Sequence, residues 1–291
     1  MKQVFSFFIL AFAMLQAHSQ TRVGLWEPYF NGNIQASVFF NGTVLEKNTH
    51  AADEHGMAVV YTLTKGMNKY SLYHAGFTPL TAQLKQAGIL NMTVAQRKEH
   101  LNEEYRYYKT FALETVKWFR KQKVKVVNMS FGTSASIFAE NNLNLGNTPE
   151  ERFLAAKQWM QEFKKSFERA FASAPEILFV VAAGNDEEDM EESFDVPGLA
   201  KLPNVLCVGA LSKDGKRIIS NRGKAVDIYV PAEDVEWIDS NGDKHIDTGT
   251  SLAVPVVVKQ AVTLLQKDSK LISEAIKKKL IEANTHSQPM P

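Results

Sequence analysis

The sequence predicts a doubly wound α/β fold, in which a mostly parallel sheet carries helices on both of its faces. Short apolar runs rich in Val and Ile are continuous rather than alternating, as expected of strands buried on both sides. Amphipathic helical patterns lie between these runs, and such alternation is typical of parallel α/β sheets. With 291 residues, the chain is long enough for one compact domain around a single large core.

Five apolar runs are predicted as buried parallel strands. They cover residues 57–61, 124–129, 177–182, 205–208 and 226–230, the first of which also fits a helix. Between them, apolar residues at helical spacing predict helices over residues 105–121 and 150–172. The polar segment 79–104 is predicted to be a largely helical insertion near the surface.

The last part of the chain carries two further predicted elements. Residues 235–239 and 244–248 flank an Asn-Gly pair, which indicates a β-hairpin. A final amphipathic helix is expected over residues 271–280, with Asp268 or Ser269 as its N-terminal cap.

The composition excludes several classes of protein. Lys and Arg total 33 against 32 Asp and Glu, for a formal net charge of +1, which argues against electrostatic binding of nucleic acid. A single cysteine, Cys207, excludes an intrachain disulfide and a cysteine-based zinc site. Because its neighbours Leu206 and Val208 are apolar, we expect Cys207 to lie in the core.

The first residues have the pattern of a secretory signal peptide. Lys2 supplies a positive charge, an apolar run follows from Val4 to Leu15, and the small residues Ala17 and Ser19 come next. We therefore expect residues 1–19 to be removed by cleavage after Ser19 and the domain of residues 20–291 to be secreted or periplasmic. No later apolar stretch has the length of a membrane span, so no membrane association is expected after signal removal.

The segment Gly249-Thr250-Ser251 through Pro255 opens an apolar helical run that extends to Leu265. This position puts Ser251 at a helix N-terminus, where free backbone N–H groups and the helix dipole favour negative charge. A nucleophilic serine benefits there, because its tetrahedral intermediate carries an oxyanion. The alternative is that these residues only cap the helix.

Asn185 and His55 are the other candidate catalytic residues. Asn185 follows the predicted strand 177–182, at the end of a parallel strand where open α/β sheets bind ligands, and its amide can donate to an oxyanion. A turn asparagine in a left-handed conformation is the alternative. His55 could act as a general base, although a single histidine beside a glycine is also compatible with a structural role.

Taken together and in order, these segments resemble the subtilisin-like serine proteases, the subtilases. The resemblance extends over roughly residues 50–285 and rests on ordered segments, namely residues 126–132, 182–185, 208–210, 220–223 with 226–228, and 249–255. It implies that Ser251 attacks a peptide carbonyl and that His55 takes its proton. It also implies that the Asn185 side chain and the Ser251 N–H hold the oxyanion, and that Ser130, Phe131 and Gly132 line the substrate groove.

The sequence departs from the family pattern where the acid of the triad is expected. One alignment places Glu27 at the acid position, on a strand that begins near Val23. A second alignment moves that position close to Gln20, where the chain has no carboxylate. The sequence is compatible with both alignments. The His-Gly motif is also altered, since Met57 and Ala58 stand where the family usually has Thr and His.

The sequence is therefore interpreted as a secreted serine endopeptidase with a peptide or protein substrate. The alternative is a catalytically impaired relative that binds peptide or protein, and an unrelated ligand-binding α/β domain is a weaker third interpretation. Residues 20–55 have room for one strand and a loop, so no propeptide domain is recognised. No cofactor or metal ligand is predicted; the resemblance suggests calcium, but no calcium site is identifiable. The oligomeric state is not predicted.

Overall fold

The computed structural model describes residues 20–28, 38–40, 54–77, 93–132, 134–141, 145–189, 201–239 and 241–284. The predicted signal peptide and residues 79–92 of the segment 79–104 lie outside these ranges, whereas residues 94–104 of that segment are helical, as predicted. Within them, no helix combines the length and the apolar character that crossing a bilayer requires.

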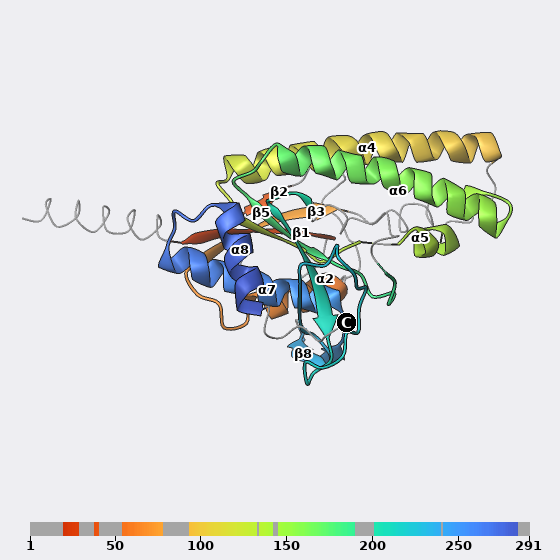
Figure 1. Ribbon diagram of the computed structural model, residues 1–291. Helices are drawn as coiled ribbons and strands as arrows, with labels where there is room; N and C mark the ends of the chain where they lie inside the picture. The colour runs from red at the N-terminus through yellow and green to blue at the C-terminus, as the bar shows by residue number, and fades with distance from the viewer. Residues whose placement is uncertain are drawn as a thin grey trace, which may run out of the picture.

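One parallel sheet forms the centre of the molecule (Figure 1). Its seven strands follow the order β2-β3-β1-β4-β5-β6-β7, and every neighbouring pair runs parallel. The strands are β1 (Thr21–Pro28), β2 (Val38–Phe40), β3 (Tyr70–Phe77), β4 (Val126–Met129), β5 (Leu178–Ala182), β6 (Val205–Leu211) and β7 (Ile228–Pro231). Since β1 lies inside the sheet, strand order reverses beside it, which is where open α/β sheets place their ligands.

Helices cover both faces of this sheet, which confirms the predicted fold class (Figure 1). One face carries α2 (Glu54–Thr64), α7 (Thr250–Lys267) and α8 (Ser273–Asn284) over a core of aliphatic residues. The other carries α4 (Val94–Lys121) and α6 (Pro149–Ala172) over a core rich in aromatic residues. The short helix α5 (Ala135–Asn141) packs against α6.

Several predicted elements are confirmed. Helix α6 begins at Pro149 behind a Thr148 capping box, in which Thr148 and Glu151 satisfy each other's backbone N–H groups. The predicted hairpin consists of the antiparallel strands β8 (Val235–Ile238) and β9 (Lys244–Asp247). Cys207 has 0% exposure, and burial raises the pKa of its thiol well above the usual value, so the thiol stays neutral.

Residues 57–61, predicted as a strand with a helix as the alternative, belong to α2, so the helical alternative is the correct one. This helix is covered by the sheet on one side and by α7 and β8 on others. It therefore buries most of its circumference, and its sequence shows a continuous apolar run rather than an amphipathic stripe. The consequence for the site is that His55 lies in the first turn of a helix.

Other differences concern missed strands and element boundaries. Strand β3 was missed because its run contains the polar residues Ser71 and His74, and β2 and α5 are too short to leave a clear pattern. Strand β7 begins at Ile228, two residues later than predicted. The predicted cap of the last helix was wrong as well: α8 begins at Ser273, and Asp268 instead ends α7.

Candidate active site

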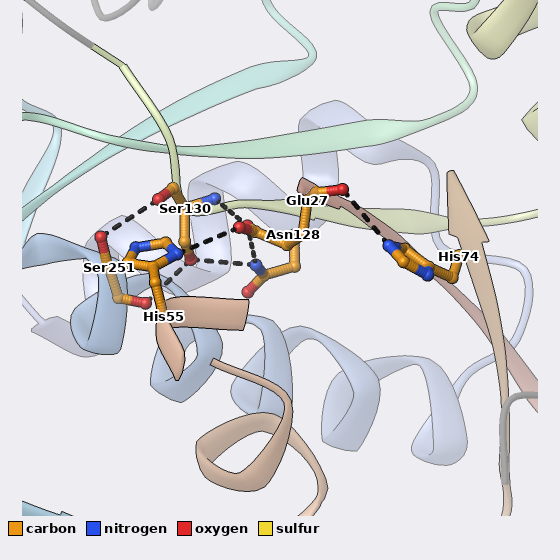
Figure 2. Close-up of polar contacts among 6 residues, drawn as sticks. All are labelled: Glu27, His55, His74, Asn128, Ser130 and Ser251. Carbon is orange, nitrogen blue, oxygen red and sulfur yellow. Dashed lines mark hydrogen bonds and ion pairs between the residues drawn. The ribbon is translucent and has the colours of Figure 1, made fainter. Parts of the chain in front are cut away.

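Glu27, His55, Ser130 and Ser251 meet at the carboxyl ends of the central strands (Figure 2). Glu27 is the penultimate residue of β1, Ser130 directly follows β4, and Asn185 follows β5. Two helix starts complete the group, since His55 lies in the first turn of α2 and Ser251 in the first turn of α7. A parallel sheet brings such positions to one edge because all its strands end there.

Glu27 is the carboxylate that faces His55. Its Oε2 lies 3.8 Å from His55 Nδ1, and Figure 2 shows the imidazole ring between Glu27 and Ser251. The Glu27 side chain has 0% exposure, whereas that of His55 is 42% exposed. Strand β1 starts at Thr21 and pairs Val23 with Val126 of β4. This register supports the alignment that puts Glu27, and not the neighbourhood of Gln20, at the acid position.

The other oxygen of Glu27 is held by the end of β4. Glu27 Oε1 accepts a hydrogen bond of 2.5 Å from the Ser130 backbone N–H and one of 3.1 Å from Asn128 Nδ2. Asn128 and Ser130 are themselves buried, at 0% and 1% exposure. A buried carboxylate needs such donors, because an ionised group without them would lose its hydration uncompensated.

Two reciprocal hydrogen bonds join Ser251 to Ser130. The Ser251 hydroxyl donates to the Ser130 carbonyl over 3.1 Å, and the Ser130 hydroxyl donates to the Ser251 carbonyl over 2.8 Å. Gly249 precedes the helix with a φ of +148°, in the region that favours glycine. These contacts fix the helix start, and with it Ser251, against the end of β4.

Asn185 lies against the same helix start. Its Oδ1 accepts hydrogen bonds from the Thr250 backbone N–H, at 2.9 Å, and from the Thr250 hydroxyl, at 3.0 Å. A Cβ at Gly249 would approach Asn185 to within 3.1 Å, so glycine also makes room for this amide. Because Oδ1 is engaged, Nδ2 is the atom of Asn185 that can donate to an oxyanion.

Asn221 organises the loop that carries Asn185. Its Nδ2 donates to the Ala183 carbonyl, and its Oδ1 accepts from the backbone N–H groups of Asp186 and Glu188. A Cβ at Gly184, where φ is +98°, would lie 2.6 Å from this amide. The loop therefore needs both a glycine before Asn185 and an asparagine at position 221.

The predicted groove residues Ser130, Phe131 and Gly132 lie directly after β4. Phe131 is half-buried and contacts Trp26 of the aromatic core, with ring centroids 6.3 Å apart, and Gly132 is exposed. Over the described ranges, no group of three or more His, Cys, Asp or Glu side chains is placed to hold a metal ion.

Comparison with known proteins agrees with this arrangement. The family model described as "Subtilase family" matches residues 21–290, and the chain therefore belongs to the subtilase family.

Among curated proteins, alkaline protease 1 of Aspergillus clavatus is 36% identical over 128 residues, which are 42% of this chain and 31% of that protein. Subtilisin-like protease 6 of Arthroderma benhamiae is 40% identical over 82 residues, which are 28% of this chain and 19% of that protein. The matched segment thus spans a third or less of the length of these relatives.

Solved structures share the fold at low sequence identity. A cold-adapted subtilisin-like serine proteinase has a TM-score of 0.52 at 18% identity, covering 89% of this chain and 81% of that one. A lanthipeptide protease has a TM-score of 0.55 at 14% identity, covering 90% and 78%.

Three residues of the site were missed as functional candidates in the sequence. Asn128 and Asn221 stand inside segments that resemble the family, but nothing local indicated what their amides contact. Thr250 was taken only as part of the nucleophile motif. Their partners lie 101, 35 and 65 positions away in the chain, so only the fold reveals the contacts.

Replacing Asn185 by Leu is expected to lower kcat by about 10²–10³ and to leave KM nearly unchanged. The reason is that Asn185 Nδ2 would bind the oxyanion and not the ground-state carbonyl. Steady-state kinetics with a peptide substrate measures both constants. An unchanged kcat, or a loss carried by KM alone, would contradict a role of Asn185 in the oxyanion hole.

Proposed function

We propose that this chain is a secreted serine endopeptidase that hydrolyses peptide bonds through an acyl-enzyme on Ser251. The observation that carries the proposal is the placement of His55 between the buried carboxylate of Glu27, 3.8 Å from Nδ1, and Ser251 (Figure 2). Membership in the subtilase family and the protease names of the curated relatives support the same class of reaction.

In this proposal each residue has one role in acyl transfer. Ser251 Oγ attacks the carbonyl carbon of the scissile bond, and its proton passes to His55 Nε2. Glu27 faces Nδ1 of the same ring, which orients the imidazole and stabilises the imidazolium. Asn185 Nδ2 and the Ser251 N–H hydrogen-bond the oxyanion.

The second half of the reaction releases the acid product. The tetrahedral intermediate collapses, the C–N bond breaks, and the leaving amine takes the proton from His55. Water then attacks the acyl group on Ser251 while His55 accepts a proton from it, and collapse returns the proton to Ser251 Oγ. No step needs a co-reactant other than water.

Ser130, Phe131 and Gly132 are proposed to bind the substrate as an additional extended strand. The Ser130 carbonyl would accept a hydrogen bond from a substrate N–H group. In the structure this carbonyl accepts the Ser251 hydroxyl, so a bound substrate would replace that contact and release the hydroxyl toward His55.

The second candidate function is binding of peptide or protein with little cleavage. Two observations favour it. The 3.8 Å between Glu27 Oε2 and His55 Nδ1 is longer than the 2.7–3.2 Å of an ordinary N–H···O hydrogen bond. In addition, the Ser251 hydroxyl points to the Ser130 carbonyl. Both features are compatible with a resting site that tightens on substrate binding.

Digestion of an unfolded protein separates the two functions. An endopeptidase is expected to release internal fragments, identified by mass spectrometry, and Ser251→Ala should release none. If the wild-type protein and Ser251→Ala both bind the intact substrate and neither releases fragments, the binding function is favoured instead.

Export is proposed from the charged and apolar pattern of residues 1–19. When the full chain is expressed in a secreting host, the protein recovered outside the cytoplasm is expected to begin at Gln20. N-terminal sequencing or intact mass measures this. Recovery of a chain that still begins at Met1, confined to the cytoplasm, would contradict export.

A further inference from the structure

We propose that Asn128 is a positioning residue for the acid of the triad. Its buried amide holds one oxygen of the Glu27 carboxylate, so that the other oxygen faces His55. This inference rests on the proposed function, in which Glu27 orients His55. It adds a residue that acts through Glu27 and does not itself touch the substrate.

The position of Asn128 follows from the pairing of the two central strands. Asn128 of β4 lies opposite Leu25 of β1, two residues before Glu27 on that strand. Its side chain is fully buried, and its Nδ2 donates to Glu27 Oε1 over 3.1 Å. The Ser130 N–H donates to the same oxygen, so both donors hold Oε1, while Oε2 is the oxygen nearer to His55.

The same amide also reaches toward the nucleophile. Asn128 Nδ2 donates to Ser130 Oγ over 3.0 Å, and that hydroxyl donates to the Ser251 carbonyl. Figure 2 shows this continuous chain of contacts from Glu27 through Asn128 and Ser130 to Ser251. One buried side chain therefore links the end of β1, which carries the acid, to the first turn of α7, which carries the nucleophile.

A glutamate needs such a contact more than an aspartate does. It has one more rotatable bond between backbone and carboxylate, so the position of its strand fixes the direction of its oxygens less closely. Two hydrogen bonds to Oε1 remove this freedom. At this site, a displacement of about 1 Å in the carboxylate would misalign the imidazole that it orients.

The burial of Asn128 also points to a role beyond stability. Among the described residues its Oδ1 has no hydrogen-bond partner, and an unsatisfied buried oxygen lowers stability. An apolar side chain of similar size would avoid this penalty at a position in the middle of the sheet. The amide is therefore better explained by the donor that it supplies to Glu27 than by its contribution to folding.

The test is a double-mutant cycle between Asn128 and Glu27. Asn128→Leu is expected to lower kcat on the order of 100-fold with little change in KM. In the Glu27→Gln background, the same Asn128→Leu change is expected to have almost no further effect, because the group through which Asn128 acts is already lost. Asn128→Ala is measured in parallel, so that a folding defect of one variant does not decide the result.

Asn204→Leu is the matched control. Asn204 is also buried and directly precedes β6, at the opposite end of the sheet. Its Nδ2 donates to the backbone carbonyls of Phe171, Ala174 and Ile177. Asn204→Leu is expected to lower the melting temperature and to leave kcat unchanged. An unchanged kcat in both Asn128 variants, or an equal loss in both Glu27 backgrounds, would overturn the inference. If Glu27→Gln itself lost no activity, the proposed role of Glu27 would fail first.

Discussion

Ser251→Ala is expected to lower turnover by about 10⁶, the cost of losing the nucleophile in subtilisin, another member of the family. Ser251 Oγ would form the covalent bond to the substrate, and alanine offers no atom in its place. The hydrogen bonds around position 251 involve its carbonyl as well as its hydroxyl. The variant should therefore fold and bind peptide with nearly wild-type affinity. The rate of hydrolysis of a peptide substrate measures the loss.

Ser166→Ala is a suitable control for this experiment. Ser166 is buried in α6, where its hydroxyl donates to the Glu162 carbonyl of the preceding turn. Ser166→Ala removes a buried serine hydroxyl that lies outside the proposed site. Hydrolysis by this variant should therefore continue at the wild-type rate. Equal hydrolysis by the wild-type protein and Ser251→Ala would show that another residue, or a contaminating protease, carries the activity.

Glu27→Gln is expected to lower kcat by about 10⁴, the size of effect seen when the acid of such a triad is removed or neutralised. The neutral amide would no longer stabilise the imidazolium that forms when His55 accepts the Ser251 proton. It can also turn its N–H group toward Nδ1, which favours the wrong tautomer of the ring. Glutamine keeps the length of the side chain, so Asn128 and Ser130 retain an oxygen to which they can donate.

Glu27→Asp separates the charge from the geometry. Aspartate keeps the negative charge, but it is shorter by one methylene and cannot reach both the Ser130 N–H and His55 from the same backbone position. An intermediate loss of kcat is expected. Steady-state kinetics of the two variants, with melting temperatures as a check of folding, gives the comparison. Wild-type activity in Glu27→Gln would show that Glu27 is not the acid.

The fold class could be predicted because strands buried on both faces leave continuous apolar runs in the sequence. The same rule failed at α2, since a helix enclosed on several sides also leaves a continuous run. Strand β3 was missed for the opposite reason, because its apolar run is interrupted by the buried His74, whose ring lies 3.3 Å from the Glu27 carbonyl oxygen. Local patterns report burial, and burial depends on neighbours that the sequence does not identify.

In the site, Ser251 and Asn185 could be predicted from short motifs at element ends, and the structure brings both to the same edge of the sheet as His55. Glu27 stayed one of two alternatives because a shift in the register of β1 changes which residue reaches the acid position. The structure supplies that register through the pairing of Glu27 with Gly76 of β3. Asn128 and Asn221 could not be assigned a role, because their partners are distant in sequence.

The reaction of Ser251 with a fluorophosphonate probe tests the central claim most directly, since it requires the nucleophile, the base and the acid together. Intact-mass measurement should show one adduct per folded chain, mapped to Ser251, with a rate that falls by about 10⁴ in Glu27→Gln. A folded wild-type protein that stays unmodified at high probe concentration, or labelling at the same rate in Glu27→Gln, would contradict the proposed triad.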